Sequence, residues 1–356
     1  MTMSSDLPHG SVLAGAGCLL ALLAAQAPAV EGLVSVKAAA PVAVDGTIEA
    51  AWEQAPALKL TLDKAPYKPD SYPGITQTEI TLRSVYDAEN IYFVLQYKDP
   101  TKSLQRFPWV KQEDGTWKQL KKLDSTGHDN TYYEDKFAIL WDINTKGFAK
   151  LGCAVVCHMS VGGKTNGVAD TSPGRKYTNR PGDTVDMWHW KGVRSDPAGQ
   201  IDDQFINDND PKGDPKEWGR QGDAKTGGGN SDNINAAKTA PAFMNPDPKD
   251  ANRYWIQDDK KVPFVDTFKA GDEVAGMIVK PFAGSRGDVI CASKWADGAW
   301  TIEFKRKLVT TGEKAAEQDV QFSDLGKAYA FGVAIFDNTQ INHLYHGGAP
   351  KLTFKP

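Results

Sequence analysis

Short runs in which apolar and polar residues alternate are the feature that most constrains the fold of this chain. The clearest pair is TEITLRSVY and IYFVLQYKD, within residues 78–99, joined by Asp87-Ala88-Glu89-Asn90. Alternation with a period of two places apolar side chains on one face of a strand, so two such runs around a short polar connection predict a β-hairpin. The sequence carries no long apolar repeat of 3.6 residues. We therefore expect an all-β chain.

Further runs extend the same pattern along the chain. They lie at residues 135–143, 184–194, 273–282, 298–308 and 327–337. Residues 42–60 add a strand, a tight Asp45-Gly46 turn, a helical turn around Trp52 and another strand. Many short strands separated by Gly, Asp and Asn turns predict a β-sandwich, which we place at residues 33–356.

Two stretches, 159–182 and 196–260, are rich in Gly, Pro, Asp and Asn and show no strand pattern. Loops of this length are uncommon in a compact domain unless they are functional or cover a ligand. We expect long irregular loops around the sandwich, with an insertion at 196–260. The Asp202-Asp203 pair and residues 207–214 offer oxygen ligands for calcium, but they lack a regular Asp-x-Asp-x-Asp-Gly loop, so we expect a solvated loop there.

Two cysteines and a histidine, Cys153, Cys157 and His158, stand within the segment CAVVCH. Covalent haem attachment commonly uses Cys-x-x-Cys-His, in which the thiols bind the porphyrin vinyl groups and the adjacent histidine ligates iron. Here one additional residue separates the cysteines, while the histidine still follows directly. This pattern favours one covalently attached haem c, held by Cys153 and Cys157, with His158 as the proximal iron ligand.

Other interpretations of the cluster stay open from the residues alone. A disulfide between Cys153 and Cys157 would close a very small loop and leave His158 without a role. A zinc site needs four ligands, for which Cys291 or another histidine would have to approach. Chance proximity is the remaining interpretation.

A haem iron ligated by His158 has room for a second axial ligand. On a strand, His189 shares a face with Met187 and Lys191, opposite Trp188 and Trp190. His343 and His346 follow the run at 327–337, in a predicted loop, where ligands often lie. The other candidates in the mature chain are His128, Met159, Met187, Met244, Met277 and Cys291.

The first 29 residues resemble a signal peptide. Residues 11–29 are uncharged, apolar and then small, with Ala27 and Ala29 before the expected cleavage point. No Lys or Arg precedes the apolar run, so a retained membrane anchor is the alternative. We expect export, to the periplasm or beyond it, with membrane contact only if this segment is retained.

The remaining composition excludes some partners. The formal net charge is -4 and no basic stripe is present, so nucleic acid is not an expected partner. Several of the ten Trp residues offer a sugar-binding platform, although packing in the core and around a ligand is the favoured role.

Five stretches together resemble the ethylbenzene dehydrogenase-related haem-binding family, which includes cytochrome c-552-like and dimethyl sulfoxide reductase-like haem-binding domains. They are VDGTIEAAW (44–52), CAVVCH (153–158), DMWHWKGVRSDPAGQIDD (186–203), GSRGDVICASKWADGAWTIEFKRKL (284–308) and FGVAIFDN (331–338). The resemblance spans roughly residues 33–356 and implies a β-sandwich that carries one haem at its edge.

The same resemblance bears on the second ligand. Subunits of molybdenum enzymes in this family hold haem noncovalently between a Met and a Lys, and the Lys follows the strand that resembles FGVAIFDN. In this chain that neighbourhood contains His343 and His346. The resemblance therefore favours His343 as the distal ligand, then His346, then His189.

These observations together predict an exported monohaem c-type cytochrome that transfers electrons between periplasmic redox proteins or within an oxidoreductase complex. We do not expect it to be an enzyme, although an accessory subunit of an oxidoreductase fits. One alternative is a haem-based sensor or small-ligand binder. Another is a carbohydrate-binding β-sandwich, because VDGTIEAAW also resembles the first segment of such modules.

Overall fold

The computed structural model describes residues 32–66, 72–157, 163–165, 168–170, 176–210, 212–247 and 253–356. The expected signal segment at 1–29 lies outside them. Within the described residues, α-helix is limited to four single turns, which confirms the all-β prediction. These helices are α1 (Ala50–Glu53), α2 (Phe148–Leu151), α3 (Ala154–Cys157) and α4 (Ala315–Gln318). No helix in this part of the chain has the length and apolar character to cross a bilayer.

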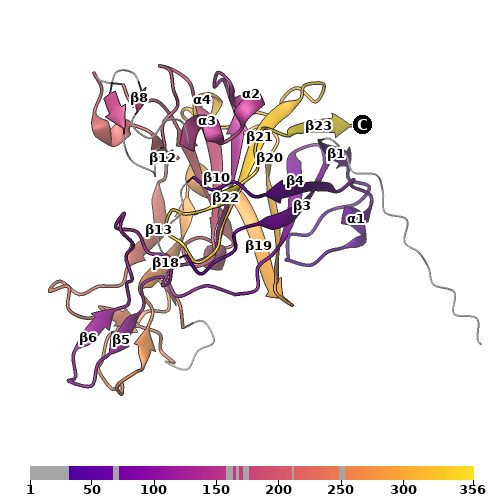
Figure 1. Cartoon of the computed structure of the whole chain (residues 1–356). Helices are drawn as coiled ribbons and strands as arrows, with labels where there is room; N and C mark the ends of the chain where they lie inside the picture. The colour runs from indigo at the N-terminus through magenta and orange to yellow at the C-terminus, as the bar shows by residue number, and fades with distance from the viewer. Residues whose placement is uncertain are drawn as a thin grey trace, which may run out of the picture.

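One large sheet closes on itself into a ring (Figure 1). The strands around the ring are, in spatial order, β1 (Leu33–Lys37), β23 (Lys351–Lys355), β21 (Tyr329–Phe336), β7 (Lys136–Asp142), β10 (Val185–Lys191), β11 (Gln200–Ile206), β19 (Val289–Ala296), β20 (Ala299–Lys307), β4 (Asn90–Lys98) and β3 (Thr78–Tyr86). Pairing of Ser35–Lys37 with Ser84–Tyr86 links β1 back to β3. The two layers of the predicted sandwich are thus joined at both edges.

Shorter strands extend this sheet or form small sheets beside it. β2 (Leu58–Leu62), β12 (Arg220–Gly222) and β22 (Leu344–Tyr345) pair with β3, β11 and β21. The small sheets contain β13 (Gly227–Asp232), β18 (Met277–Ala283) and β15 (Ile256–Gln257); β14 (Phe243–Met244) and β16 (Val262–Pro263); β17 (Glu273–Val274), β5 (Trp109–Lys111) and β6 (Trp117–Gln119); and β8 (Gly163–Thr165) and β9 (Val168–Asp170). In Figure 1, β5 and β6 lie at the opposite end of the molecule from α2 and α3.

Aromatic side chains fill the ring. The indoles of Trp141 and Trp188 lie with ring centroids 5.3 Å apart, and Phe93 stacks on Phe304 at 5.1 Å. Trp141, Trp188 and Trp190 are 0% exposed, so they form the core, as favoured, and not an open sugar platform. Alternation along each strand puts these rings inside and leaves the intervening residues on the outer face.

The expected insertion at 196–260 is not one irregular loop. It contains β11, an inner member of the large sheet that pairs with both β10 and β19, and four shorter strands, β12 to β15. The sequence of β11, QIDDQFI, conceals this role because its polar residues are buried rather than solvated. The prediction of a solvated loop at Asp202-Asp203 is wrong, since both side chains are 0% exposed.

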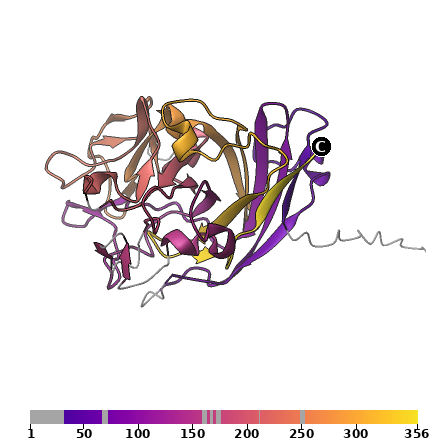
Figure 2. The ribbon, with the colours of Figure 1, turned by 90° about the horizontal axis from the view of Figure 1, so that it is seen from above.

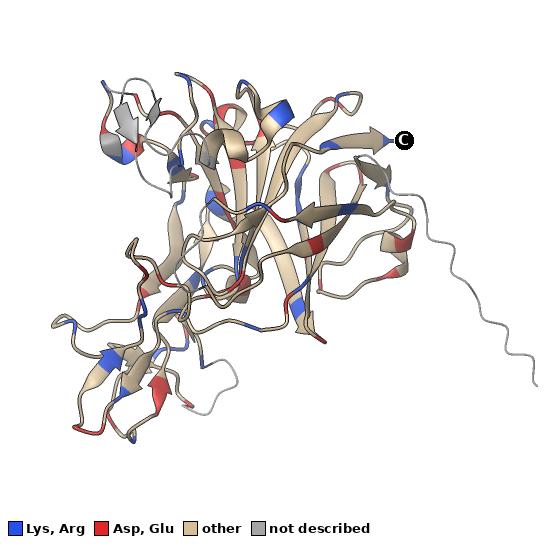
Figure 3. Cartoon of the chain, viewed as in Figure 1, with Lys and Arg blue, Asp and Glu red and all other residues tan. Residues whose placement is uncertain are grey.

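The α2–α3 segment packs on the outside of the ring against β21, near the yellow C-terminal strands in Figure 2. Two glycines allow this approach. A β-carbon on Gly152, whose φ is +60°, would lie 2.2 Å from the Gly348 carbonyl oxygen, and one on Gly332 would lie 2.8 Å from the Cys153 backbone nitrogen. Figure 3 shows acidic and basic residues interspersed along the ribbon.

Candidate functional site

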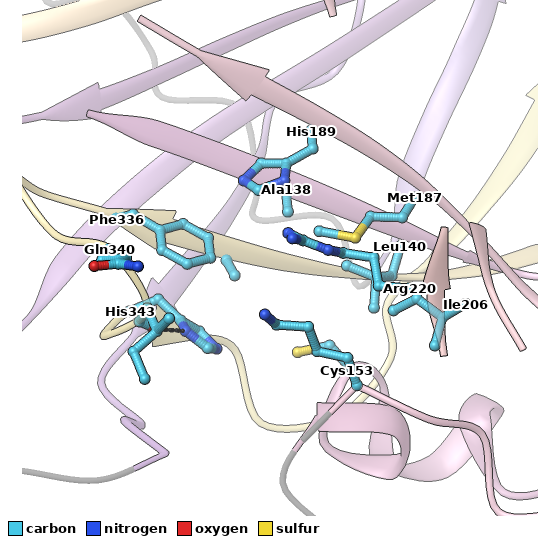
Figure 4. Close-up of a pocket in the computed structure, with 13 residues that line it drawn as sticks. Ala138, Leu140, Cys153, Met187, His189, Ile206, Arg220, Phe336, Gln340 and His343 are labelled. Atoms are coloured by element: carbon cyan, nitrogen blue, oxygen red, sulfur yellow. Dashed lines mark hydrogen bonds between the residues drawn. The ribbon is translucent and has the colours of Figure 1, made fainter. Parts of the chain in front are cut away.

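A cavity lies between the outer face of the sheet and the segments packed on it (Figure 4). Strands β7, β10, β11 and β21 form its floor, while Cys153 and residues 340–343 border it from the other segments. The lining residues are Ala138, Leu140, Cys153, Lys176, Met187, His189, Ile206, Arg220, Ala334, Phe336, Gln340, Ile341 and His343.

The floor of the cavity is apolar and partly flat. Ala138 on β7 lies between two register partners, Ala334 on β21 and His189 on β10. Their methyl groups leave space above the sheet, and the larger apolar side chains of Leu140, Met187 and Phe336 surround it. Such a surface suits a planar apolar ligand.

His189 projects from the floor and is 3% exposed. Its Nδ1 lies 3.4 Å from Oε1 of Gln204, while its Nε2 is buried and has no hydrogen-bond partner. Since the Gln204 oxygen can only accept, Nδ1 carries the proton and Nε2 holds the lone pair. Burial, and after it the positive charges of Lys191 and Arg220, hold the pKa of His189 well below 6.5. A neutral imidazole with an unsatisfied Nε2 is a suitable metal ligand.

The orientation of Gln204 is itself fixed by a chain of contacts. Its Nε2 donates to Oδ2 of Asp202 at 2.9 Å, which leaves Oε1 toward His189. Asp202 also accepts from Arg286 Nε at 2.6 Å and from the Lys191 ammonium. Although burial alone would raise the pKa of Asp202, the charges of Lys191 and Arg286 lower it to about 2. A fixed carboxylate thus positions the amide that positions the imidazole.

His343 borders the same cavity from the loop after β21. Its Nδ1 lies 2.7 Å from the Ile341 carbonyl oxygen, so this nitrogen donates and Nε2 holds the lone pair. The ring packs against Phe336, with centroids 4.6 Å apart. Burial lowers the pKa of His343 to about 4. Figure 4 shows His343 and Cys153 across the cavity from His189 and Met187.

His346 does not join this group. Its Nδ1 lies 3.0 Å from the Thr61 carbonyl oxygen, and it does not line the cavity. The structure therefore brings together two of the three predicted distal candidates, His189 and His343.

Cys153, one of the two predicted attachment residues, is 2% exposed and lines the cavity. Cys157 ends α3, one helical turn further along the chain, and His158 lies outside the described residues. Cys291 packs in the aromatic core inside the ring, whereas Cys153 belongs to the apolar cluster on the outer face of the sheet. Cys291 therefore cannot complete a zinc site with Cys153.

Basic residues border the cavity. Lys176 and Arg220 line it, and the ammonium of Lys136 donates to the Gln340 carbonyl oxygen at 2.9 Å beside Phe336. The charges of Lys176 and Arg220 favour a ligand that carries carboxylates. Sequence reasoning missed Gln204, Lys176 and Arg220 as site residues; for Gln204 the available signal was its position two residues after Asp202, on the same face of a strand.

A sequence profile described as "Ethylbenzene dehydrogenase" matches residues 49–348. A search of curated proteins gives no significant match.

Similar solved structures include a family 9 carbohydrate-binding module from Caldicellulosiruptor kristjanssonii in complex with cellotriose (9% identity, 91% of this chain, 93% of that chain, TM-score 0.33). Another is a protein from Bacteroides uniformis that is proposed to bind carbohydrate (9% identity, 91% of this chain, 100% of that chain, TM-score 0.36). Similarity at this level does not transfer a ligand to this chain.

Proposed function

The chain belongs to the ethylbenzene dehydrogenase family, and we propose that it is an exported monohaem c-type cytochrome that transfers electrons between periplasmic redox partners. The observation that carries this proposal is the cavity that gathers Cys153, His343 and the unsatisfied Nε2 of His189. The family description names an oxidoreductase, so an oxidoreductase complex is the partner that we favour.

The residues around the cavity fit a haem group. The flat floor at Ala138 and Ala334 suits the face of a porphyrin, and Lys176 and Arg220 suit its two carboxylates. Cys153 and Cys157 would hold the ring through thioethers, and His158 would be the proximal ligand. When bound, the haem supplies one-electron chemistry at its iron, and the buried apolar walls and axial ligands set the reduction potential.

The sixth ligand that we propose is His189, ahead of His343. A buried imidazole nitrogen without a partner is costly, and coordination to a metal removes that cost. The Gln204 contact also fixes the tautomer and ring orientation of His189, as expected for a metal-ligating histidine. This order reverses the one that the family resemblance favours.

Covalent attachment tests the proposal directly. The full chain, expressed together with the periplasmic haem-attachment machinery, should give a c-type pyridine haemochrome spectrum. Cys153→Ser and Cys157→Ser should each leave one vinyl group unreacted and move the haemochrome band to longer wavelength. Cys291→Ser is the matched control, because Cys291 is equally buried but lies in the core, and it should keep the c-type spectrum.

Two outcomes would contradict the proposal. Wild-type protein without covalent haem would refute c-type attachment. Rapid and complete carbon monoxide binding to the reduced protein would indicate an open sixth position, which favours a sensor or small-ligand binder over electron transfer.

A further inference from the structure

We propose that Asp203, Asp223 and Asp319 form a binding site for one Ca²⁺ ion, separate from the cavity on the outer face. One carboxylate oxygen from each residue lies within 4.8 Å of the corresponding atoms of the other two. The three side chains are 0%, 3% and 1% exposed. This spacing matches oxygens that share one Ca²⁺ at distances of about 2.3–2.6 Å.

Each of these carboxylates has one hydrogen-bonded oxygen and one oxygen without a hydrogen-bond donor. The oxygens that lack a donor are Oδ2 of Asp203, Oδ1 of Asp223 and Oδ1 of Asp319, all of them buried. A buried charged oxygen without a partner is costly, so the arrangement indicates a missing cationic ligand. The donors to the satisfied oxygens are the backbone N–H of Gln204 at 3.0 Å, the Ser285 hydroxyl at 3.3 Å and the Thr310 hydroxyl at 2.5 Å.

The protein itself supplies too little positive charge at this place. Arg306 donates to Asp186 at 3.0 Å, and the same nitrogen is 3.9 Å from Asp203 Oδ2. Among the described residues, no Lys or Arg forms an ion pair with Asp223 or Asp319.

A second buried acidic group differs from the first in how fully its carboxylate oxygens are hydrogen-bonded. Asp99, Asp135 and Asp337 also converge, but their oxygens are largely satisfied by the protein. The donors to Asp135 and Asp337 are the backbone N–H groups of Ser103, Asn338 and Ile75, the Trp300 indole and the Thr101 hydroxyl. Only Asp99 Oδ2 lacks a partner in this group, so we do not expect it to bind a cation.

Calcium suits the first group better than magnesium. The ligands are carboxylates from three separate segments, and Ca²⁺ accepts irregular sets of six to eight oxygens, whereas Mg²⁺ requires near-octahedral geometry. Gly222, Ala224 and Gln318, the chain neighbours of Asp223 and Asp319, line an open hollow. Its other lining residues include Glu217, Glu313 and Glu317.

The test is a calcium titration of the full-length, haem-loaded protein after treatment with a chelator. At about 5 mM Ca²⁺, we expect the midpoint of thermal unfolding to rise by about 3–5 °C, and Mg²⁺ at the same concentration to have a much smaller effect. Elemental analysis should find one calcium per chain after incubation with excess calcium and removal of unbound metal by dialysis against metal-free buffer.

Variants locate the site. Asp223→Asn and Asp319→Asn should abolish the calcium-dependent shift. Asp99→Asn in the second acidic group and Asp210→Asn in the exposed loop should retain it. A wild-type protein whose unfolding midpoint does not respond to calcium would overturn the proposal, even if the Asn variants fail to fold. A response that is lost in Asp99→Asn or Asp210→Asn, but kept in Asp223→Asn, would overturn it as well.

Discussion

Nδ1 of His189 lies 3.4 Å from Oε1 of Gln204, across the adjacent strands β10 and β11. The contact determines which nitrogen of His189 carries the proton, and it leaves Nε2 unsatisfied beside a cavity that also contains Cys153 and His343. This relationship is the main structural reason to rank His189 above His343 as the proposed metal ligand.

Replacing the three candidate distal ligands one at a time should separate them. His189→Ala should convert the low-spin spectrum of the proposed haem to high spin and allow carbon monoxide to bind rapidly to the reduced protein. His343→Ala should keep the low-spin bands, with at most a small shift, because this ring borders the cavity without ligating iron. His346→Ala is the control, since His346 contacts Thr61 instead. Loss of the low-spin spectrum in His343→Ala alone would reverse the assignment.

Two substitutions at Gln204 should shift the reduction potential in opposite directions. Gln204→Glu places a stronger acceptor at Nδ1, makes the imidazole more electron-donating and should lower the midpoint potential; Gln204→Leu removes the acceptor and should raise it. We expect shifts on the order of tens of millivolts, measured by spectroelectrochemistry. Gln96→Leu, on β4, removes a hydrogen bond to Thr301 and should leave the potential unchanged. Shifts of the same sign in both Gln204 variants would argue against a role through Nδ1.

Much of the fold could be predicted because local patterns specify it. The hairpin predicted at 78–99 is β3 and β4, and Met187 and His189 lie on one face of β10 as predicted. Alternation along a strand is sufficient to determine both features. Strand β11 was missed because its carboxylates resemble those of a solvated loop. Only the partners Lys191 and Arg286, which come from elsewhere in the chain, allow Asp202 to be buried.

The composition of the site was harder to predict than its location. The sequence placed Cys153 in a candidate ligand site, but whether His189, His343 or His346 shares that site depends on which strands become neighbours around the ring. Pairing of β7 with both β10 and β21 brings His189 and Phe336 to one cavity, although nearly 150 residues separate them. Such long-range pairing is not encoded in any single segment.

Gly332 should be intolerant of any side chain. Its missing β-carbon would lie 2.8 Å from the Cys153 backbone nitrogen and 3.2 Å from the Cys153 Cβ, so Gly332→Ala should push the α2–α3 segment off the sheet. We expect a loss of about 1–3 kcal/mol in unfolding free energy, together with reduced covalent haem incorporation. Gly347→Ala is the matched control, because its new methyl group would meet only the Lys64 side chain, at 3.8 Å. Normal haem incorporation in Gly332→Ala would show that the segment does not need this close approach.

Asp202 should stabilise the protein only above acidic pH. Its usual pKa is 3.8 and its pKa in the folded chain is about 2, because Lys191 and Arg286 outweigh the effect of burial. A carboxyl whose folded pKa is lower contributes stability above its unfolded pKa and loses it as the pH falls through its folded pKa; here the contribution is about 2 kcal/mol. In urea unfolding, the difference in unfolding free energy between wild type and Asp202→Asn should stay constant from about pH 7 to pH 4. It should then shrink toward pH 2. As the control, Asp210→Asn on the exposed loop should show no pH-dependent change in its unfolding free energy relative to wild type. If the unfolding free energy lost in Asp202→Asn does not depend on pH, ionisation of Asp202 does not stabilise the fold.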